Sequence, residues 1–109
     1  MHHRTASLAF CALVAAFFAT VPAVAQDAGN ALRGEELAAR ICADCHGVNK
    51  GDASRNWSAP PFEKVAASEG MSATALNVAL ISSHRDMPNL ILQPAERANV
   101  IAYIMSLKD

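Results

Sequence analysis

The sequence lacks the charge balance of a nucleic-acid-binding protein and the long apolar run of a membrane-spanning one. Its nine basic residues are outnumbered by ten acidic residues, which gives a net charge of −1. Nucleic-acid-binding domains depend on clustered Lys and Arg, so we expect no nucleic-acid partner. The longest apolar run, LAFCALVAAFFA, covers about twelve residues, whereas a membrane-spanning helix needs about twenty.

Patterns typical of β-strands are also missing, because alternation of apolar and polar residues never extends over a useful length. We find no internal repeat either. Apolar residues instead recur at helical spacing, as Leu37 and Ile41 do in one segment and Val100 and Ile104 do in another. The sequence therefore predicts an all-α fold of about four helices.

The first two expected helices are separated by a long loop. Residues 31–45 form the first, and Gly47 is well placed to end it. The segment 47–61 is rich in Gly, Asn, Ser and Pro and is expected to be a loop. A loop of this length in a small domain usually wraps something or is functional. The second helix, 62–70, follows two prolines and closes at a glycine.

The last two expected helices are joined by a second irregular segment, 84–93. Ser72 can cap a helix over 73–83, because its hydroxyl can accept a hydrogen bond from a free backbone N–H. Pro94 suits the first turn of the terminal helix, and Lys108 in its last turn would favour the helix dipole.

Residues 1–25 have the three parts of a secretory signal peptide: a start that carries Arg4, an apolar middle, and small residues at Ala23 and Ala25. We expect cleavage after Ala25, export, and no stable membrane insertion afterwards. Retention of this segment as a membrane anchor is the alternative. Residues 26–109 then form one domain.

Cleavage would remove 25 of the 109 residues and leave 84, a size at which a core of side chains alone is marginal. Such domains usually need a metal, a disulfide or another apolar filler. The remaining chain keeps eight basic residues, ten acidic residues and two cysteines, Cys42 and Cys45. A disulfide between cysteines so close together would close almost no loop and stabilise little.

The segment CADCH places Cys42, Cys45 and His46 within five residues, and three kinds of site could use them. A structural zinc site needs four ligands, and His84 is the one histidine left after the motif. A thioredoxin-like redox pair needs neighbouring strands, which are not expected here. In a C-x-x-C-H motif, two thiols can instead attach one haem covalently. We therefore interpret the motif as a haem c attachment site, and the haem supplies the missing apolar mass.

With these residues assigned, the chain resembles the class I c-type cytochromes from about residue 33 to residue 108. Gly34 stands where that family keeps a small residue in its first helix, and Tyr103 stands at the aromatic position of its last helix. The segment MPN, which begins at Met87, follows a loop and precedes the last helix. Ala38 departs from the pattern, since many relatives have an aromatic residue there.

The resemblance implies one haem c bound through Cys42 and Cys45, with His46 and Met87 as the axial ligands of the iron. A sulfur ligand favours the ferrous state, whereas ligation by His84 instead of Met87 would lower the potential. A proline carbonyl after the motif is expected to accept a hydrogen bond from the histidine that binds the iron.

Four residues of the loop after the motif are candidates for these supporting roles. The accepting carbonyl belongs to Pro60 or Pro61. Arg55 and Trp57 either bind a haem propionate, cover the haem edge or face solvent.

The implied function is that of a periplasmic one-electron carrier, and not that of an enzyme. Such a carrier meets its redox partner proteins in transient complexes. Two alternatives remain open. The chain could be the haem subunit of a larger periplasmic dehydrogenase or oxidase complex, or a ligand-binding haem protein with a displaceable sixth ligand.

Overall fold

A computed structural model describes residues 28–84 and 86–108. This part of the chain forms four helices, and the predicted all-α fold is confirmed because no strand occurs within it. The helices are α1 (Ala31–Ile41), α2 (Phe62–Ala67), α3 (Ala73–Ile81) and α4 (Pro94–Ser106). The predicted signal peptide and its cleavage point lie outside the described residues. None of the described helices is both long and apolar enough to cross a membrane.

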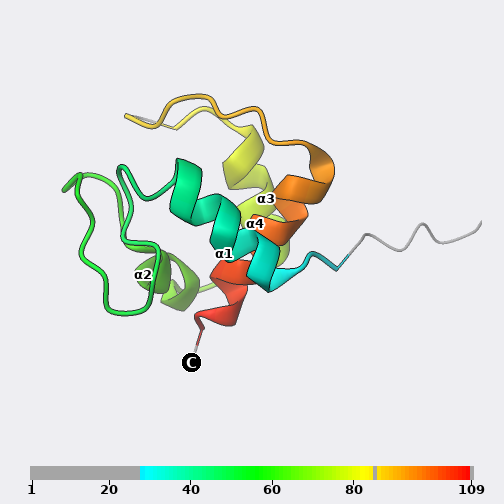
Figure 1. Ribbon diagram of the computed structural model, residues 1–109, viewed down its shortest axis with the longest axis horizontal. Coiled ribbons are helices and arrows are strands. Elements are labelled where there is room, and N and C mark those ends of the chain that lie inside the picture. Colours follow the sequence, from blue (N-terminus) through cyan, green and yellow to red (C-terminus); the bar gives the residue numbers. More distant parts are fainter. Residues whose placement is uncertain (1–27, 85, 109) are drawn as a thin grey trace, which may run out of the picture.

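Helix α4 is the centre of the fold, because it contacts each of the other three helices. Figure 1 shows α1 crossing α4, with α3 on another side of α4 and α2 at the far end of the long loop. The buried core follows this arrangement, with Val100, Tyr103 and Ile104 from α4 meeting Ala38 of α1 and Leu76 of α3.

The crossing of α1 and α4 depends on the absence of a side chain at Gly34. A Cβ atom there would overlap the backbone carbonyl of Asn99 and lie 2.8 Å from the Cβ of Tyr103. Gly34 and Tyr103, the two family-like positions of the first and last helices, therefore pack against each other. The same contact is extended by the amide of Asn30, which donates to Asn99 Oδ1 at 2.7 Å.

Both predicted starts of the C-terminal helices are confirmed. Ser72 caps α3, since its hydroxyl accepts a hydrogen bond from the amide of Ala75 at 3.1 Å. Pro94 is the first residue of α4, where its missing N–H costs nothing. Glu96 accepts from the amide of Gln93 at 2.9 Å and so closes the start of the helix.

All four helices end earlier in the chain than the sequence predicted. Helix α1 ends at Ile41, and the motif forms a tight turn in which the carbonyl of Cys42 accepts from the amides of Cys45 and His46. Helix α4 ends at Ser106, because the amide of Leu107 turns back to an i−3 carbonyl. Lys108 therefore lies beyond the last turn, and the expectation that it occupies that turn was wrong.

Helices α2 and α3 end early for a shared reason. Ser68 and Ser82 follow them in extended conformation, and each hydroxyl donates to the carbonyl four residues back, at 2.9 and 2.7 Å. Serine competes with the helix backbone in this way and favours helix ends. Gly70, with φ +73°, belongs to the turn that follows α2.

Candidate functional site

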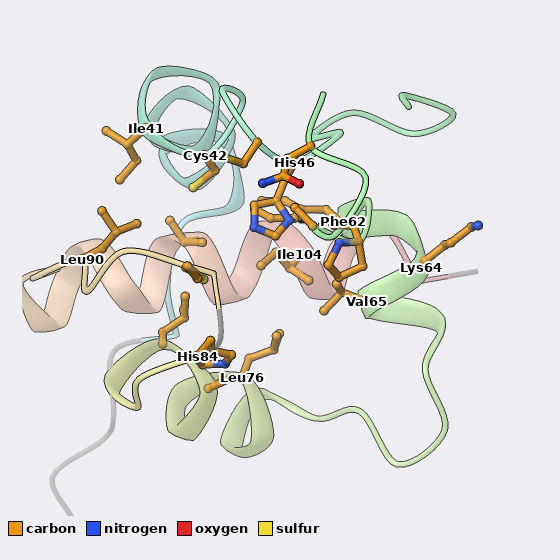
Figure 2. A pocket seen from close by; sticks show the side chains of 18 of the residues that line it. Ile41, Cys42, His46, Phe62, Lys64, Val65, Leu76, His84, Leu90 and Ile104 are labelled. Atoms are coloured by element: carbon orange, nitrogen blue, oxygen red, sulfur yellow. Dashed lines mark hydrogen bonds between the residues drawn. The ribbon is translucent and has the colours of Figure 1, made fainter. Parts of the chain in front are cut away.

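One large cavity of about 590 Å³ lies between the helices and the two loops. This volume falls in the range of about 300–1,000 Å³ that is usual for cofactor and small-molecule sites. Figure 2 shows Cys42 and His46 on one side of it, Leu76 and His84 on the opposite side, and Ile104 of α4 behind.

Both cysteines and the histidine of the C-x-x-C-H motif line this cavity. Cys42 and Cys45 form no disulfide with each other, and the tight turn after α1 brings both to the same wall. Burial raises the pKa of the Cys42 thiol to about 11, since the thiolate would lose its hydration. The Cys42 side chain is thus already within the apolar interior that a covalently held group would occupy.

The ring of His46 is fixed by one hydrogen bond and one ring contact. Nδ1 lies 2.7 Å from the carbonyl oxygen of Pro60, and the ring centroid lies 5.3 Å from that of Phe62. A carbonyl can only accept, so Nδ1 carries the proton and Nε2 keeps a free lone pair. This is the orientation that a metal-binding imidazole needs. Of the two prolines expected for this role, the structure identifies Pro60.

The loop that carries Pro60 is bonded to the motif along its length. The amide of Asn56 donates to the carbonyl of Cys45 at 3.0 Å, and the amide of Phe62 donates to that of Gly47 at 2.8 Å. The hydroxyl of Tyr103 donates to the carbonyl of Val48 at 2.9 Å. These bonds fix the Pro60 carbonyl relative to His46, so the loop wraps the site as its length suggested.

Met87 and His84 both line the same cavity from the second loop. They are the ends of a tight turn in which the amide of Met87 approaches the carbonyl of His84 at 3.4 Å. Asp86, at φ 62°, makes the turn possible, because Asp tolerates the left-handed region better than most residues. Met87 is half-buried, whereas His84 is exposed and bonds through Nδ1 to the carbonyl of Ser82.

Two candidates from the first loop lie away from the cavity wall. Trp57 is 97 % exposed and Arg55 is exposed, and neither lines the cavity, so the structure supports the solvent-facing alternative for both. The polar lining on this side comes from Asn56, Ser58 and Lys64. Sequence reasoning missed Lys64, because a lysine in an amphipathic helix gives no signal that its stem borders a cavity.

The residues around this cavity fit a covalently attached haem. Two thiols and an imidazole with a free Nε2 lie on one wall, a thioether and a second imidazole are available from the facing loop, and the remaining surface is mainly apolar. Fold and donor set together define a small haem c protein of the electron-transfer class.

Comparison with known proteins gives the same assignment. The family model for cytochrome c matches residues 31–108. Cytochrome c-552 of Bradyrhizobium diazoefficiens is 36% identical over 98 residues, which cover 90% of this chain and 91% of that protein. No solved structure gives a significant match.

The chain belongs to the cytochrome c family. Members of this family bind haem c covalently and transfer electrons to and from redox partners, and they are not enzymes. Cys42 and Cys45 fit the attachment motif of the family.

Proposed function

We propose that this cytochrome is a periplasmic one-electron carrier whose haem is attached through Cys42 and Cys45 and whose iron is bound by His46 and Met87. The observation that carries the proposal is that one cavity is lined by all four side chains, with the His46 ring already oriented by Pro60. Export rests on the signal-peptide pattern of residues 1–25.

The chain's own residues account for the carrier chemistry. Bound haem supplies an iron that gains and loses one electron. The Nδ1–H of His46 donates a hydrogen bond to the carbonyl of Pro60, which would make Nε2 a better ligand for the metal. As a ligand, the Met87 thioether would favour the reduced state of the iron and so raise the reduction potential. If His46 and Met87 both bind the iron, substrates would have no access to it, and the mainly apolar lining would limit its contact with water.

His84 is the competing ligand, because it lines the cavity and belongs to the same turn as Met87. Met87 is favoured since it is the more buried of the two. The Nδ1 of His84 is bonded to the carbonyl of Ser82 much as that of His46 is bonded to Pro60, so this hydrogen bond does not separate the two candidates.

Three single variants of the holoprotein test the ligand assignment. Ferric haem with a sulfur ligand has a weak far-red absorption band, which Met87→Ala should abolish. Met71→Ala is the matched control, because Met71 is also a half-buried methionine of the cavity wall, and it should retain the band. A band that survives in Met87→Ala but disappears in Met71→Ala would show the ligand to be Met71. Absence of the band in the unmodified protein, with a spectrum changed by His84→Ala, would favour His84.

A further inference from the structure

The loop of residues 82–93, here called the distal loop, carries Met87 and has few hydrogen bonds of its own. Among its described residues, the backbone bond from Met87 to His84 lies within one turn. The hydroxyl of Ser82 and the ring of His84 bond to carbonyls two to four residues away. These bonds lie within the first part of the loop or join it to the end of α3, the helix that precedes it, and none of them reaches α1, α2 or α4.

Arg97 attaches the second part of the distal loop. Arg97 lies near the start of α4, and its side chain is half-buried. Its Nε donates a hydrogen bond to Asn77 Oδ1 of α3 at 2.8 Å. One terminal nitrogen of the same guanidinium lies 3.3 Å from the carbonyl oxygen of Leu92. A single side chain therefore joins α3, α4 and the distal loop.

The position of Leu92 makes this connection relevant to the site. Leu92 and Leu90 line the large cavity with Met87, so the bonded carbonyl belongs to the stretch that forms the wall. A guanidinium holds its N–H donors in one rigid plane, so it can bond two acceptors at once in fixed directions. A lysine ammonium is a single compact charge and cannot replace it fully. Movement of the loop away from the helices would break the bond to Leu92.

We propose that Arg97 is a positioning residue for Met87: it holds the distal loop against α3 and α4 and so keeps the thioether directed into the haem cavity. The proposal rests on the proposed function, since it takes Met87 as the ligand. It assigns Arg97 no contact with haem. The rival explanation is that Arg97 only stabilises the packing of α3 on α4.

The test compares holoprotein variants for loss of the sulfur ligand and loss of the fold. In Arg97→Ala, we expect the far-red band to disappear on heating well before the helices melt, as followed by circular dichroism. Imidazole should replace the sulfur ligand about tenfold faster, the size expected for loss of a charge-assisted hydrogen bond. Arg97→Lys should lie between Arg97→Ala and the unmodified protein in both measurements.

Two further variants separate the Arg97 bonds from a general effect of charge. Asn77→Leu removes one acceptor and should act in the same direction as Arg97→Ala, although less strongly. Arg33→Ala removes an exposed arginine of α1 and should leave the rate of imidazole binding unchanged. Parallel loss of band and helix in Arg97→Ala, without faster imidazole binding, would show that the residue is merely structural and overturn the proposal.

Hydrogen–deuterium exchange separates failure of this proposal from failure of the ligand assignment. If the unmodified holoprotein has no far-red band, Met87 is not the ligand and the proposed function is wrong in that respect. The connection made by Arg97 can still be read from the backbone amides of Met87 and Gln93, which donate hydrogen bonds on either side of Leu92. Faster exchange in Arg97→Ala supports the connection, and unchanged exchange contradicts it.

Discussion

At the scale of single residues, His46 and Tyr103 each use one polar atom to fix a backbone carbonyl of the first loop. His46 donates to Pro60 and Tyr103 donates to Val48. The two bonds lie at opposite ends of the same loop, so the loop is fastened both to the ring that faces the cavity and to the helix at the centre of the fold.

The Tyr103 hydroxyl gives a pH-dependent prediction. Burial, with smaller contributions from the carboxylates of Glu35 and Asp52, raises the pKa of Tyr103 above its ordinary value of 10. The unfolded chain therefore loses this proton at a lower pH than the folded chain does. The stability that Tyr103 contributes is complete below pH 10 and decreases as the pH rises through the folded-state pKa.

We expect Tyr103→Phe to lower the free energy of unfolding by about 1–3 kcal/mol at pH 7, because the buried Val48 carbonyl loses its donor. The difference from the unmodified holoprotein should shrink above about pH 10. Urea unfolding of both proteins at neutral and alkaline pH measures it. A difference that stays constant with pH would contradict the linkage.

At this scale, residue types and spacing predicted the motif but not every neighbour. Cys42, Cys45 and His46 could be identified because the chemistry of C-x-x-C-H is local in sequence. The choice of Pro60 over Pro61 and the exposure of Trp57 depend on how the loop folds back, which the sequence does not encode in any periodic pattern.

At the scale of the elements, α1 and α4 approach each other closely at Gly34. Substitution of Gly34 by valine would force the helices apart, because the new side chain meets the Asn99 carbonyl and Tyr103. We expect a loss of about 1–3 kcal/mol or more from overpacking. Ala39→Val, at an exposed position of α1, should cost only about 0.5 kcal/mol of helix propensity.

Urea unfolding of the two holoprotein variants measures this difference. The packing account requires Gly34→Val to be clearly the less stable of the two. Equal losses would mean that the helices can separate at little cost, and the role given to Gly34 would be wrong.

Starts of helices were more predictable than their ends. Ser72 and Pro94 mark starts through chemistry specific to those positions. The ends are hidden because the apolar pattern continues past them: Leu107 extends the row of Val100 and Ile104, although the backbone has already tightened into a turn. The serines that end α2 and α3 gave no clear signal in the sequence, because a serine can also lie inside a helix.

At the scale of the whole molecule, the size of the cavity determines how the protein depends on its cofactor. Without haem, the mainly apolar lining of this cavity of about 590 Å³ would be exposed to water, and a small domain has little other core to compensate. Small domains have a total stability of only about 5–15 kcal/mol, so we expect the chain to need its haem in order to fold. The sequence already indicated that the fold needs an apolar filler, because the domain is small and its two cysteines cannot form a disulfide that stabilises it.

We therefore expect a Cys42→Ala/Cys45→Ala double variant, which cannot attach haem, to lose most of its helical circular dichroism. Cys45→Ala alone keeps one thiol for attachment and should retain a folded holoprotein of lower stability. A double variant that stays fully helical without haem would show that the domain folds independently of its cofactor.

The most direct test of the central claim is the absorption spectrum of the holoprotein, ferric and ferrous, with and without carbon monoxide. If His46 and Met87 fill both axial positions as proposed, we expect a low-spin haem c spectrum with the far-red sulfur-to-iron band, unchanged by carbon monoxide. A high-spin spectrum that shifts when carbon monoxide is added would contradict the carrier assignment, since it would reveal an open iron that binds ligands.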